Sequence, residues 1–434
     1  MVCRNESTSE RISITFFRMR PLPSFMCSLP LTSLALRQPD VRRLALFFGV
    51  TYFVQGFADL SSGLTYQPIQ YLLKEQLQLS AADAGGFWAI VGLGWTLKPL
   101  YGFLSDSVPF AGYRRKSYLI LMALIGAFCW SVLTFFPFSY TTLLCALTLC
   151  AASLAFTDVM TDALMVETGR PLRLTGSFQA IQWGSLSFAL ILAQFFGGYL
   201  ATYAAVQSVF LLAAGFPLIL MIVTLSLVRE PPITGPQIAF ADTLAALRHT
   251  TRTPMLWTSV VFLFLWNFSP SFGTPLLYYE TDVLKFSKVF IGALGAITQV
   301  GSVLGAVLFL LYGRAIPLRR LLSVAVVLGV FSTLSFLGLV GPRSAVGLFF
   351  FSGMINQITH LAVLDLAART CPVRAAGTVF ALLMSTLNLG TSSGRIFGGW
   401  LYEFAGFPVL ILISTLGTAL CWLIIPFVRE PHEE

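Results

Sequence analysis

The chain has 434 residues, of which 56% are hydrophobic and only 11% are charged, and its mean hydropathy is +0.80. This composition excludes a water-soluble domain, whose surface needs many more polar side chains, and indicates an integral membrane protein. The net charge of +8 does not indicate a nucleic-acid partner, because the cations fall at the ends of apolar segments and form no basic face.

Glycine and phenylalanine, at 35 and 39 residues, are typical of closely packed membrane helices. A β-barrel would instead alternate apolar and polar residues along short strands. We therefore predict an all-α protein embedded in a lipid bilayer.

Residues 1–43 contain seven arginines and no apolar stretch long enough to cross a bilayer, so we predict a cytoplasmic N-terminal extension. An Arg- and Ser-rich start also resembles an organellar transit peptide, although Glu6, Glu10 and Asp40 count against that interpretation.

Twelve apolar segments follow, each long enough for the roughly 20 residues that a spanning helix needs. They cover residues 44–72, 84–105, 117–136, 142–165, 175–203, 207–228, 255–279, 289–312, 319–340, 344–367, 375–402 and 407–428.

The distribution of Lys and Arg predicts the orientation, because short cytoplasmic loops hold the excess of these residues. With both termini inside, 21 of the 27 cations are cytoplasmic. Only Lys74, Lys285, Lys288 and Arg343 then lie outside. We predict a multi-pass protein of the bacterial plasma membrane with both termini in the cytoplasm, and an organellar inner membrane is the alternative.

The longest internal break, residues 229–254, divides the chain into two six-helix halves, 44–228 and 255–428, and leaves a cytoplasmic tail at 429–434. The halves look alike when shifted by about 201 residues, because FFGGYL at 195–200 lies over IFGGWL at 396–401. Two same-direction six-helix pseudo-repeats predict the major facilitator fold, whose halves rock around a central site.

Four stretches of the first half together resemble the folate–biopterin transporter family of the major facilitator superfamily. They are YFVQG (52–56), KPLYGFLSDSVPFAGYRRKSYLIL (98–121), FTDVMTDALMVETGR (156–170) and GSFQAIQWG (176–184). The resemblance implies a carrier that moves folates or pterins by proton symport. Asp59 departs from the pattern expected of that family. An extra anion there disfavours a glutamate-tailed folate unless it is protonated or paired.

Ionisable side chains deep in a membrane are costly, so each one is a candidate for a role in a cavity. Asp158 and Asp162 are four residues apart and share one helix face, which Glu167 nearly joins. Two such carboxylates do not both ionise easily, and this is what a proton carrier requires. The alternative is a structural ion pair with Lys98 or Arg395.

Lys98 lies about 12 Å along the helix axis from Asp106, so we expect each to have another partner. Pairing with a carboxylate and binding of an anionic substrate are equal alternatives for Lys98. The superfamily pattern GxxxD followed by basic residues predicts an inward gate. Its residues are Gly102, Asp106, Arg114, Arg115 and Lys116.

Arg395 is a candidate for holding a substrate carboxylate, because its planar guanidinium suits bidentate recognition. Pairing with Asp365 is the competing explanation. His360 offers a hydrogen bond or a proton relay, and polar packing between helices explains it as well. A flat pterin would also need aromatic and amide side chains. The candidates are Tyr66, Trp88, Trp95, Gln179, Trp183, Trp266 and Asn267.

The seven cysteines and three histidines show no metal-ligand spacing, and no phosphate-binding GxxxxGK[ST] motif occurs. We expect no metal, no cofactor and a monomer. The first functional hypothesis is a proton-coupled folate or pterin transporter that works by alternating access. The second is a carrier for another small solute, such as a sugar, peptidoglycan fragment, nucleotide derivative or drug. A membrane-embedded enzyme or receptor is a third, but no nucleophile and base pair supports catalysis.

Overall fold

The computed structural model describes residues 39–231, 254–270, 272–313, 316–371 and 376–428. The predicted extension up to residue 38, most of the predicted linker and the predicted tail lie outside these residues. The described residues from Arg43 onward belong to one compact unit, and the described residues 39–42 fall in a separate one. Below, the first half means the described residues 43–231 and the second half means 254–428.

The described chain is almost entirely helical, and nine of its helices are long and apolar enough to cross a membrane. These nine correspond to the last ten of the twelve predicted segments, because one of them, Val379–Phe427, overlaps both the eleventh and the twelfth. At Gly406 that helix is interrupted by φ 79° and ψ 175°, a backbone conformation that is almost confined to glycine.

The first two predicted segments are broken into shorter helices. The first consists of α2 (Pro39–Ala58), α3 (Tyr66–Tyr71) and the π-helix η2 (Leu72–Gln76). The second consists of α4 (Ala81–Val91), α5 (Leu93–Thr96) and α6 (Lys98–Ser107). Between α2 and α3 the backbone N–H of Gly63 donates to the carbonyl of Asp59, at 2.7 Å. A side chain at Gly63 would collide with the carbonyls of Phe57 and Asp59, so the turn needs glycine.

The seventh segment is broken in the same way. It consists of α12 (Pro254–Phe268), α13 (Gly273–Tyr278) and the π-helix η3 (Tyr279–Val283). Broken helices at corresponding places in two repeats are a feature of transporters, in which the irregular backbone borders the binding site.

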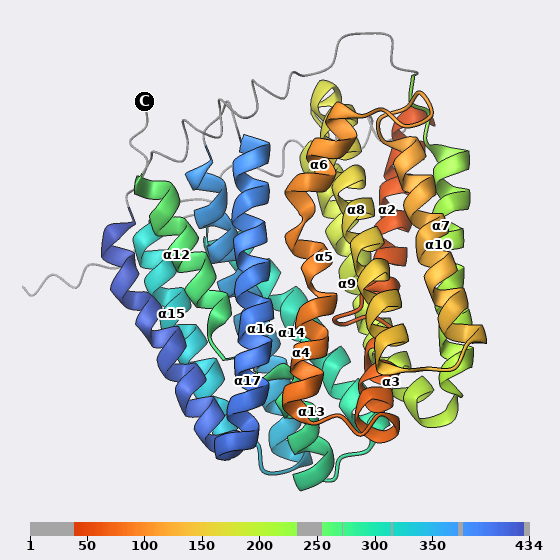
Figure 1. Ribbon diagram of the computed structural model, residues 1–434. Helices are drawn as coiled ribbons and strands as arrows, with labels where there is room; N and C mark the ends of the chain where they lie inside the picture. Colours follow the sequence, from red (N-terminus) through yellow and green to blue (C-terminus); the bar gives the residue numbers. More distant parts are fainter. Residues whose placement is uncertain (1–38, 232–253, 271, 314–315, 372–375, 429–434) are drawn as a thin grey trace, which may run out of the picture. The chain divides into compact units, whose positions relative to one another are not determined.

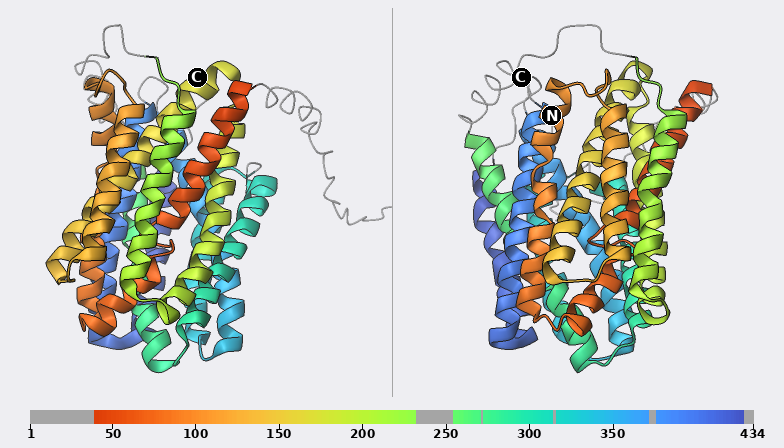
Figure 2. Two further views of the ribbon diagram at one scale, coloured as in Figure 1. Left: turned by 90° about the vertical axis from the view of Figure 1, so that its right-hand side faces the viewer. Right: turned by 45° about the vertical axis from the view of Figure 1, so that its right-hand side comes forward.

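The remaining helices are long. In the first half they are α7 (Lys116–Phe135), α8 (Tyr140–Leu172), α9 (Thr175–Tyr203) and α10 (Val206–Leu227). In the second half they are α14 (Lys288–Tyr312), α15 (Leu318–Ser335) with the 3-10 turn η5 (Phe336–Gly338), α16 (Pro342–Thr370), α17 (Ala376–Leu420) and the 3-10 helix η7 (Cys421–Phe427). The first-half helices, drawn red to light green, form one bundle (Figures 1 and 2).

Each half packs around its own buried core. In the first half Phe87, Trp130 and Phe210 belong to one cluster of buried side chains. In the second half a cluster of aliphatic and aromatic side chains includes Phe262 and Leu366. Separate cores allow each half to move as one body.

Glycines let helices of the two halves approach closely. Gly198 on α9 lies against Gly292 on α14, and Gly85 on α4 lies against Gly399 on α17. Small residues at such crossings are the usual means by which membrane helices pack, since no hydrophobic effect drives them together within the lipid.

Candidate functional site

The loop between the second and third predicted segments folds as a two-residue hairpin. Phe110 and Tyr113 exchange backbone hydrogen bonds of 3.0 and 3.1 Å. Ala111 and Gly112 between them have φ angles of 50° and 81°. Positive φ at both central residues is the pattern of a type I′ turn, and it brings Arg114 back toward the end of α6.

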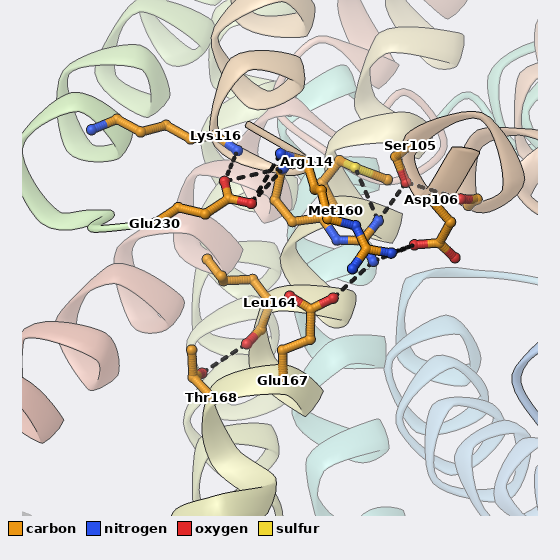
Figure 3. Close-up of polar contacts among 11 residues, drawn as sticks. Ser105, Asp106, Arg114, Lys116, Met160, Leu164, Glu167, Thr168 and Glu230 are labelled. Atoms are coloured by element: carbon orange, nitrogen blue, oxygen red, sulfur yellow. Dashed lines mark hydrogen bonds and ion pairs between the residues drawn. The ribbon is translucent and has the colours of Figure 1, made fainter. Parts of the chain in front are cut away.

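Arg115, directly before α7, connects α6 with α8 in a cluster of charges, through Asp106 and Glu167, two of the residues labelled in Figure 3. Its guanidinium lies 2.6 Å from Asp106 and 2.9 Å from Glu167, and it also donates to Ser105. Arg114 forms a longer ion pair of 3.2 Å with Asp106. Burial lowers the pKa of Arg115, but Glu167 and Asp106 outweigh this effect and raise the pKa above its ordinary value, so the cation stays charged.

Glu230, three residues after the end of α10, belongs to the same cluster. The sequence did not indicate a role for this residue. Its carboxylate accepts hydrogen bonds from the backbone N–H groups of Arg114, Arg115 and Lys116, at 2.8 to 3.1 Å. These groups form the start of α7, where the helix dipole favours an anion. The only signal in the sequence is an acidic residue next to Arg229 at the end of an apolar segment.

The five residues predicted for the inward gate lie in or beside this cluster. Gly102 on α6 faces Val159, because an added Cβ would lie 3.7 Å from that side chain. The Lys116 ammonium donates to the carbonyl of Val228, at 2.9 Å. All of the ion pairs of this cluster join first-half residues, and the gating role stays a prediction.

Asp158 and Asp162 lie at the centre of the first half, where α2, α6, α8 and α9 meet. Asp158 pairs with Lys98, at 2.6 Å, and both side chains are mostly buried. Asp162 accepts a hydrogen bond of 2.5 Å from the Tyr52 hydroxyl and a long one of 3.5 Å from the Gln182 amide. The structure therefore brings three of the predicted transport residues together. We call Tyr52, Lys98, Asp158, Asp162 and Gln182 the carboxylate cluster.

The carboxylate cluster holds two acids and one cation. Because Lys98 pairs with Asp158, Asp162 has only neutral hydrogen-bond donors and makes no ion pair among the described residues. An ionised Asp162 would be costly in the membrane interior, and a protonated one would not. Asp162 is the member of the cluster that can gain and lose a proton without breaking the Lys98 pair.

Asp59 holds the turn that separates α2 from α3. Its carboxylate accepts from the backbone N–H of Ser61, at 3.0 Å, and from the Ser62 hydroxyl, at 2.6 Å. This arrangement is an Asx turn, in which a short acidic side chain stabilises its own loop. The contacts explain an acid at this position locally, and a role in transport stays a prediction.

Arg395, Asp365 and His360 do not form one group. Arg395 on α17 donates to the carbonyl of Trp88, at 3.3 Å. Asp365 pairs with Arg369 one turn further along α16, at 2.9 Å. Arg395 and Asp365 therefore do not form the ion pair that was the competing explanation for Arg395. His360 is half-buried on α16.

Arg395 instead borders a polar site beside α3. The Tyr66 ring lies 5.5 Å from the Trp88 ring, and the Gln70 amide donates to the Tyr66 hydroxyl, at 2.8 Å. Glu280 is buried in η3, which continues α13, and α13 packs against α4. We call Tyr66, Gln70, Trp88, Glu280 and Arg395 the α3 site.

Two ion pairs connect the halves at the end of the bundle that carries η2 and η3, which the charge distribution predicts to be outside. Lys74 lies 2.5 Å from Asp282, and Lys288 lies 2.6 Å from Glu75. The Tyr278 hydroxyl also donates to the carbonyl of Leu79, at 2.7 Å. We call Lys74, Glu75, Asp282 and Lys288 the outer charge pairs.

Both carboxylates of the outer charge pairs are about half exposed, 56% for Asp282 and 51% for Glu75. Exposed pairs of this kind contribute only about 0–1 kcal/mol each, so they can form and break readily. The sequence did not reveal these pairs, because their members are more than 200 residues apart and look like ordinary loop charges.

The BT1 family matches residues 55–428 of the chain. A folate–biopterin transporter from Synechocystis sp. is 32% identical, with 85% of this chain and 78% of that protein covered. A probable folate–biopterin transporter from Arabidopsis thaliana is 24% identical, with 82% and 87% covered.

Among solved structures, a nucleoside transporter, NupG, matches with a TM-score of 0.68 at 14% identity, over 88% of this chain and 98% of its own. A D-xylose–proton symporter matches with a TM-score of 0.68 at 15% identity, over 90% and 98%. At such identities the likeness concerns the fold, and it confirms the predicted major facilitator architecture.

Proposed function

We infer the function from one premise: the chain belongs to the BT1 family, the folate–biopterin transporter family of the major facilitator superfamily. It is a multi-pass membrane transporter and not an enzyme.

We propose that the substrate is folate or a pterin. The names of the relatives support this class, and the α3 site supplies what such a ligand needs. Tyr66 and Trp88 offer ring faces, and Gln70 and Glu280 offer polar groups. Arg395 adds a cation suited to the carboxylates of a glutamate tail.

We propose that transport follows alternating access. The outer charge pairs and the crossing of Gly198 with Gly292 join the halves at one end of the bundle. The Arg115 cluster, at the other end, joins only first-half helices. This asymmetry is expected of a carrier closed at the predicted outer end, and the cycle then requires the outer charge pairs to break.

We propose that a proton drives the transport, and that Asp162 carries it. This proposal is supported by the charges of the carboxylate cluster, which holds two acids and one cation. Lys98 forms an ion pair with Asp158, and Asp162 receives only neutral hydrogen bonds, from Tyr52 and Gln182. Protonating Asp162 removes the uncompensated charge, so the loaded state can change conformation at lower cost.

The purified full chain in proteoliposomes tests the substrate class. We expect an inward proton gradient to drive uptake of labelled biopterin or folate. Unlabelled pterin should compete, and a sugar and a nucleoside should not. Uptake of the unrelated solutes with no response to pterins would reject the proposed substrate class in favour of another carrier function.

Arg395→Ala should weaken transport of carboxylated substrates more than of neutral ones. A bidentate arginine–carboxylate contact is worth roughly 1.5–3 kcal/mol, so half-saturation for folate should rise about 10- to 100-fold. Half-saturation for biopterin, which has no carboxylate, should change by less than about threefold. An equal rise for both substrates would mean that Arg395 is structural, acting through its bond to Trp88.

A further inference from the structure

In the described chain, five buried polar side-chain atoms without partners lie on α3, α4 and η3. Native proteins pair nearly all such atoms, so a group of them marks a place where a ligand can supply the missing partners. Tyr66 of α3 packs against Trp88 of α4, Tyr71 of α3 shares a core cluster with Leu277 of α13, and α13, which continues into η3, contacts α4. The five atoms on these elements that have no hydrogen-bond partner among the described residues are Oε1 of Gln67, Oε1 of Gln70, the hydroxyl of Tyr71, Nε1 of Trp88 and Oε1 of Glu280.

Glu280 is the charged member of this group and is only 3% exposed. Glu280 follows Tyr278, whose hydroxyl donates to the carbonyl of Leu79 just before α4, and Leu277, which shares a core cluster with Tyr71 of α3. It therefore lies where α13 and η3 pack against α3 and α4, the helices that carry Tyr66 and Trp88. The predicted seventh segment ended at residue 279, and the sequence therefore did not single out Glu280 as a membrane carboxylate.

The internal repeat shows that the fold does not need an acid at this position. In this part of the chain the matching elements of the two halves are 207 residues apart, and not about 201 as at FFGGYL and IFGGWL. The starts of the two π-helices, Leu72 and Tyr279, match at this offset, and so do the helix caps that follow, Ser80 and Ser287. The same offset places Leu73, which is fully buried, at the counterpart of Glu280. An apolar side chain thus fills this position in one half, and a carboxylate fills it in the other.

No cation of the described chain forms an ion pair with Glu280. Lys74 pairs with Asp282, Lys288 pairs with Glu75, and Arg395 bonds to the carbonyl of Trp88. A buried carboxylate without a cation is unfavourable, and replacing it by an apolar residue is often neutral or stabilising. Packing therefore gives no reason for Glu280, whereas a ligand that presents paired donors does.

We propose that Glu280 binds the 2-amino-4-oxopyrimidine edge of a pterin, with the ring held against Tyr66 and Trp88. That edge presents two parallel donors, the ring N3–H and the 2-amino group, which match the two oxygens of a carboxylate as a guanidinium does. The inference rests on the proposed pterin substrate and deepens it. In this arrangement Arg395 binds the glutamate tail, the anionic part at the other end of a folate.

The test compares two ligands that differ at this edge. Pterin carries the 2-amino group, and lumazine, the 2,4-dioxo pteridine, carries an oxygen in its place. Equilibrium binding to the purified full chain should favour pterin about 10- to 100-fold, the usual effect of a hydrogen bond to a charged group. Glu280→Gln should reverse this preference, because an amide can accept from N3–H and donate to the 2-oxo group of lumazine.

Asp83→Asn is the matched control, since it makes the same acid-to-amide change on an exposed residue at the first turn of α4. It should keep the preference of the unmodified chain. Binding of lumazine by Glu280→Gln also shows that the variant is folded.

The outcomes separate this inference from the proposed function. If the unmodified chain prefers pterin and Glu280→Gln keeps that preference, Glu280 does not bind the pyrimidine edge. Only this inference then fails. The same holds if Glu280→Gln loses proton dependence alone, which would make Glu280 a proton site. If the unmodified chain binds neither pteridine, the substrate class fails and this inference fails with it.

Discussion

Asp162→Asn is expected to abolish accumulation of substrate against its gradient while leaving exchange intact. Asparagine keeps the shape and can still accept from Tyr52, but it carries no proton and no charge. With one proton per substrate, a pH difference of one unit can sustain about a tenfold accumulation. In the variant this ratio should fall to about one, because the pH gradient no longer contributes to the driving force.

The measurement uses proteoliposomes with and without an acid exterior, and exchange is followed with unlabelled biopterin inside and labelled biopterin outside. Asp83→Asn, an exposed acid-to-amide change, should behave as the unmodified chain does. Asp158→Asn separates the two carboxylates, since it leaves Lys98 without its 2.6 Å partner and should lower exchange as well. If Asp162→Asn still accumulates substrate under a pH gradient, Asp162 is not the proton carrier.

The carboxylate cluster was largely predictable because its signals are local. Two acids four residues apart must share a helix face, and a lysine within an apolar segment needs an anion. The structure adds Tyr52 and Gln182, whose side chains are ordinary in sequence and become informative only when α2 and α9 meet α8.

The outer charge pairs and Glu280 were not predictable by the same reasoning. The pairs depend on how two halves dock, which no local pattern encodes. Glu280 lies one residue beyond the predicted end of an apolar run, because the helix continues as a π-helix after Tyr278. Segment boundaries derived from hydropathy carry errors of several residues, and here the error hid a buried acid.

The twelve predicted segments appear as nine long spans because the first two are broken into shorter helices and the last two join in one helix with a kink at Gly406. GFADLSSG in the first segment and NFSPSFG in the seventh contain Gly, Pro, Ser and Asp, which are turn-forming residues. Hydropathy averages over such short interruptions. The breaks align in the repeat, and the α3 site lies directly after the first of them.

Gly198→Val should stop both accumulation and exchange, which distinguishes it from Asp162→Asn. An added Cβ at Gly198 would lie 2.7 Å from the carbonyl oxygen of Lys288 and 2.9 Å from the Cα of Gly292. Backbone atoms cannot turn away as a side chain can, so α9 and α14 would have to separate. Overpacking of this kind costs about 1–3 kcal/mol and acts only in the state in which the halves touch.

Such a cost shifts the balance between the two states about 5- to 150-fold toward the one that is open at the predicted outer end. Gly198→Ala, which adds only the Cβ, should give a smaller loss of exchange. Gly184→Val is the matched control on the same helix, because an added Cβ there meets no atom within 4 Å. Size-exclusion profiles and melting temperatures of all three variants check that the protein is folded. Normal exchange in Gly198→Val, or an equal loss in Gly184→Val, would show that the crossing of α9 and α14 does not close in the transport cycle.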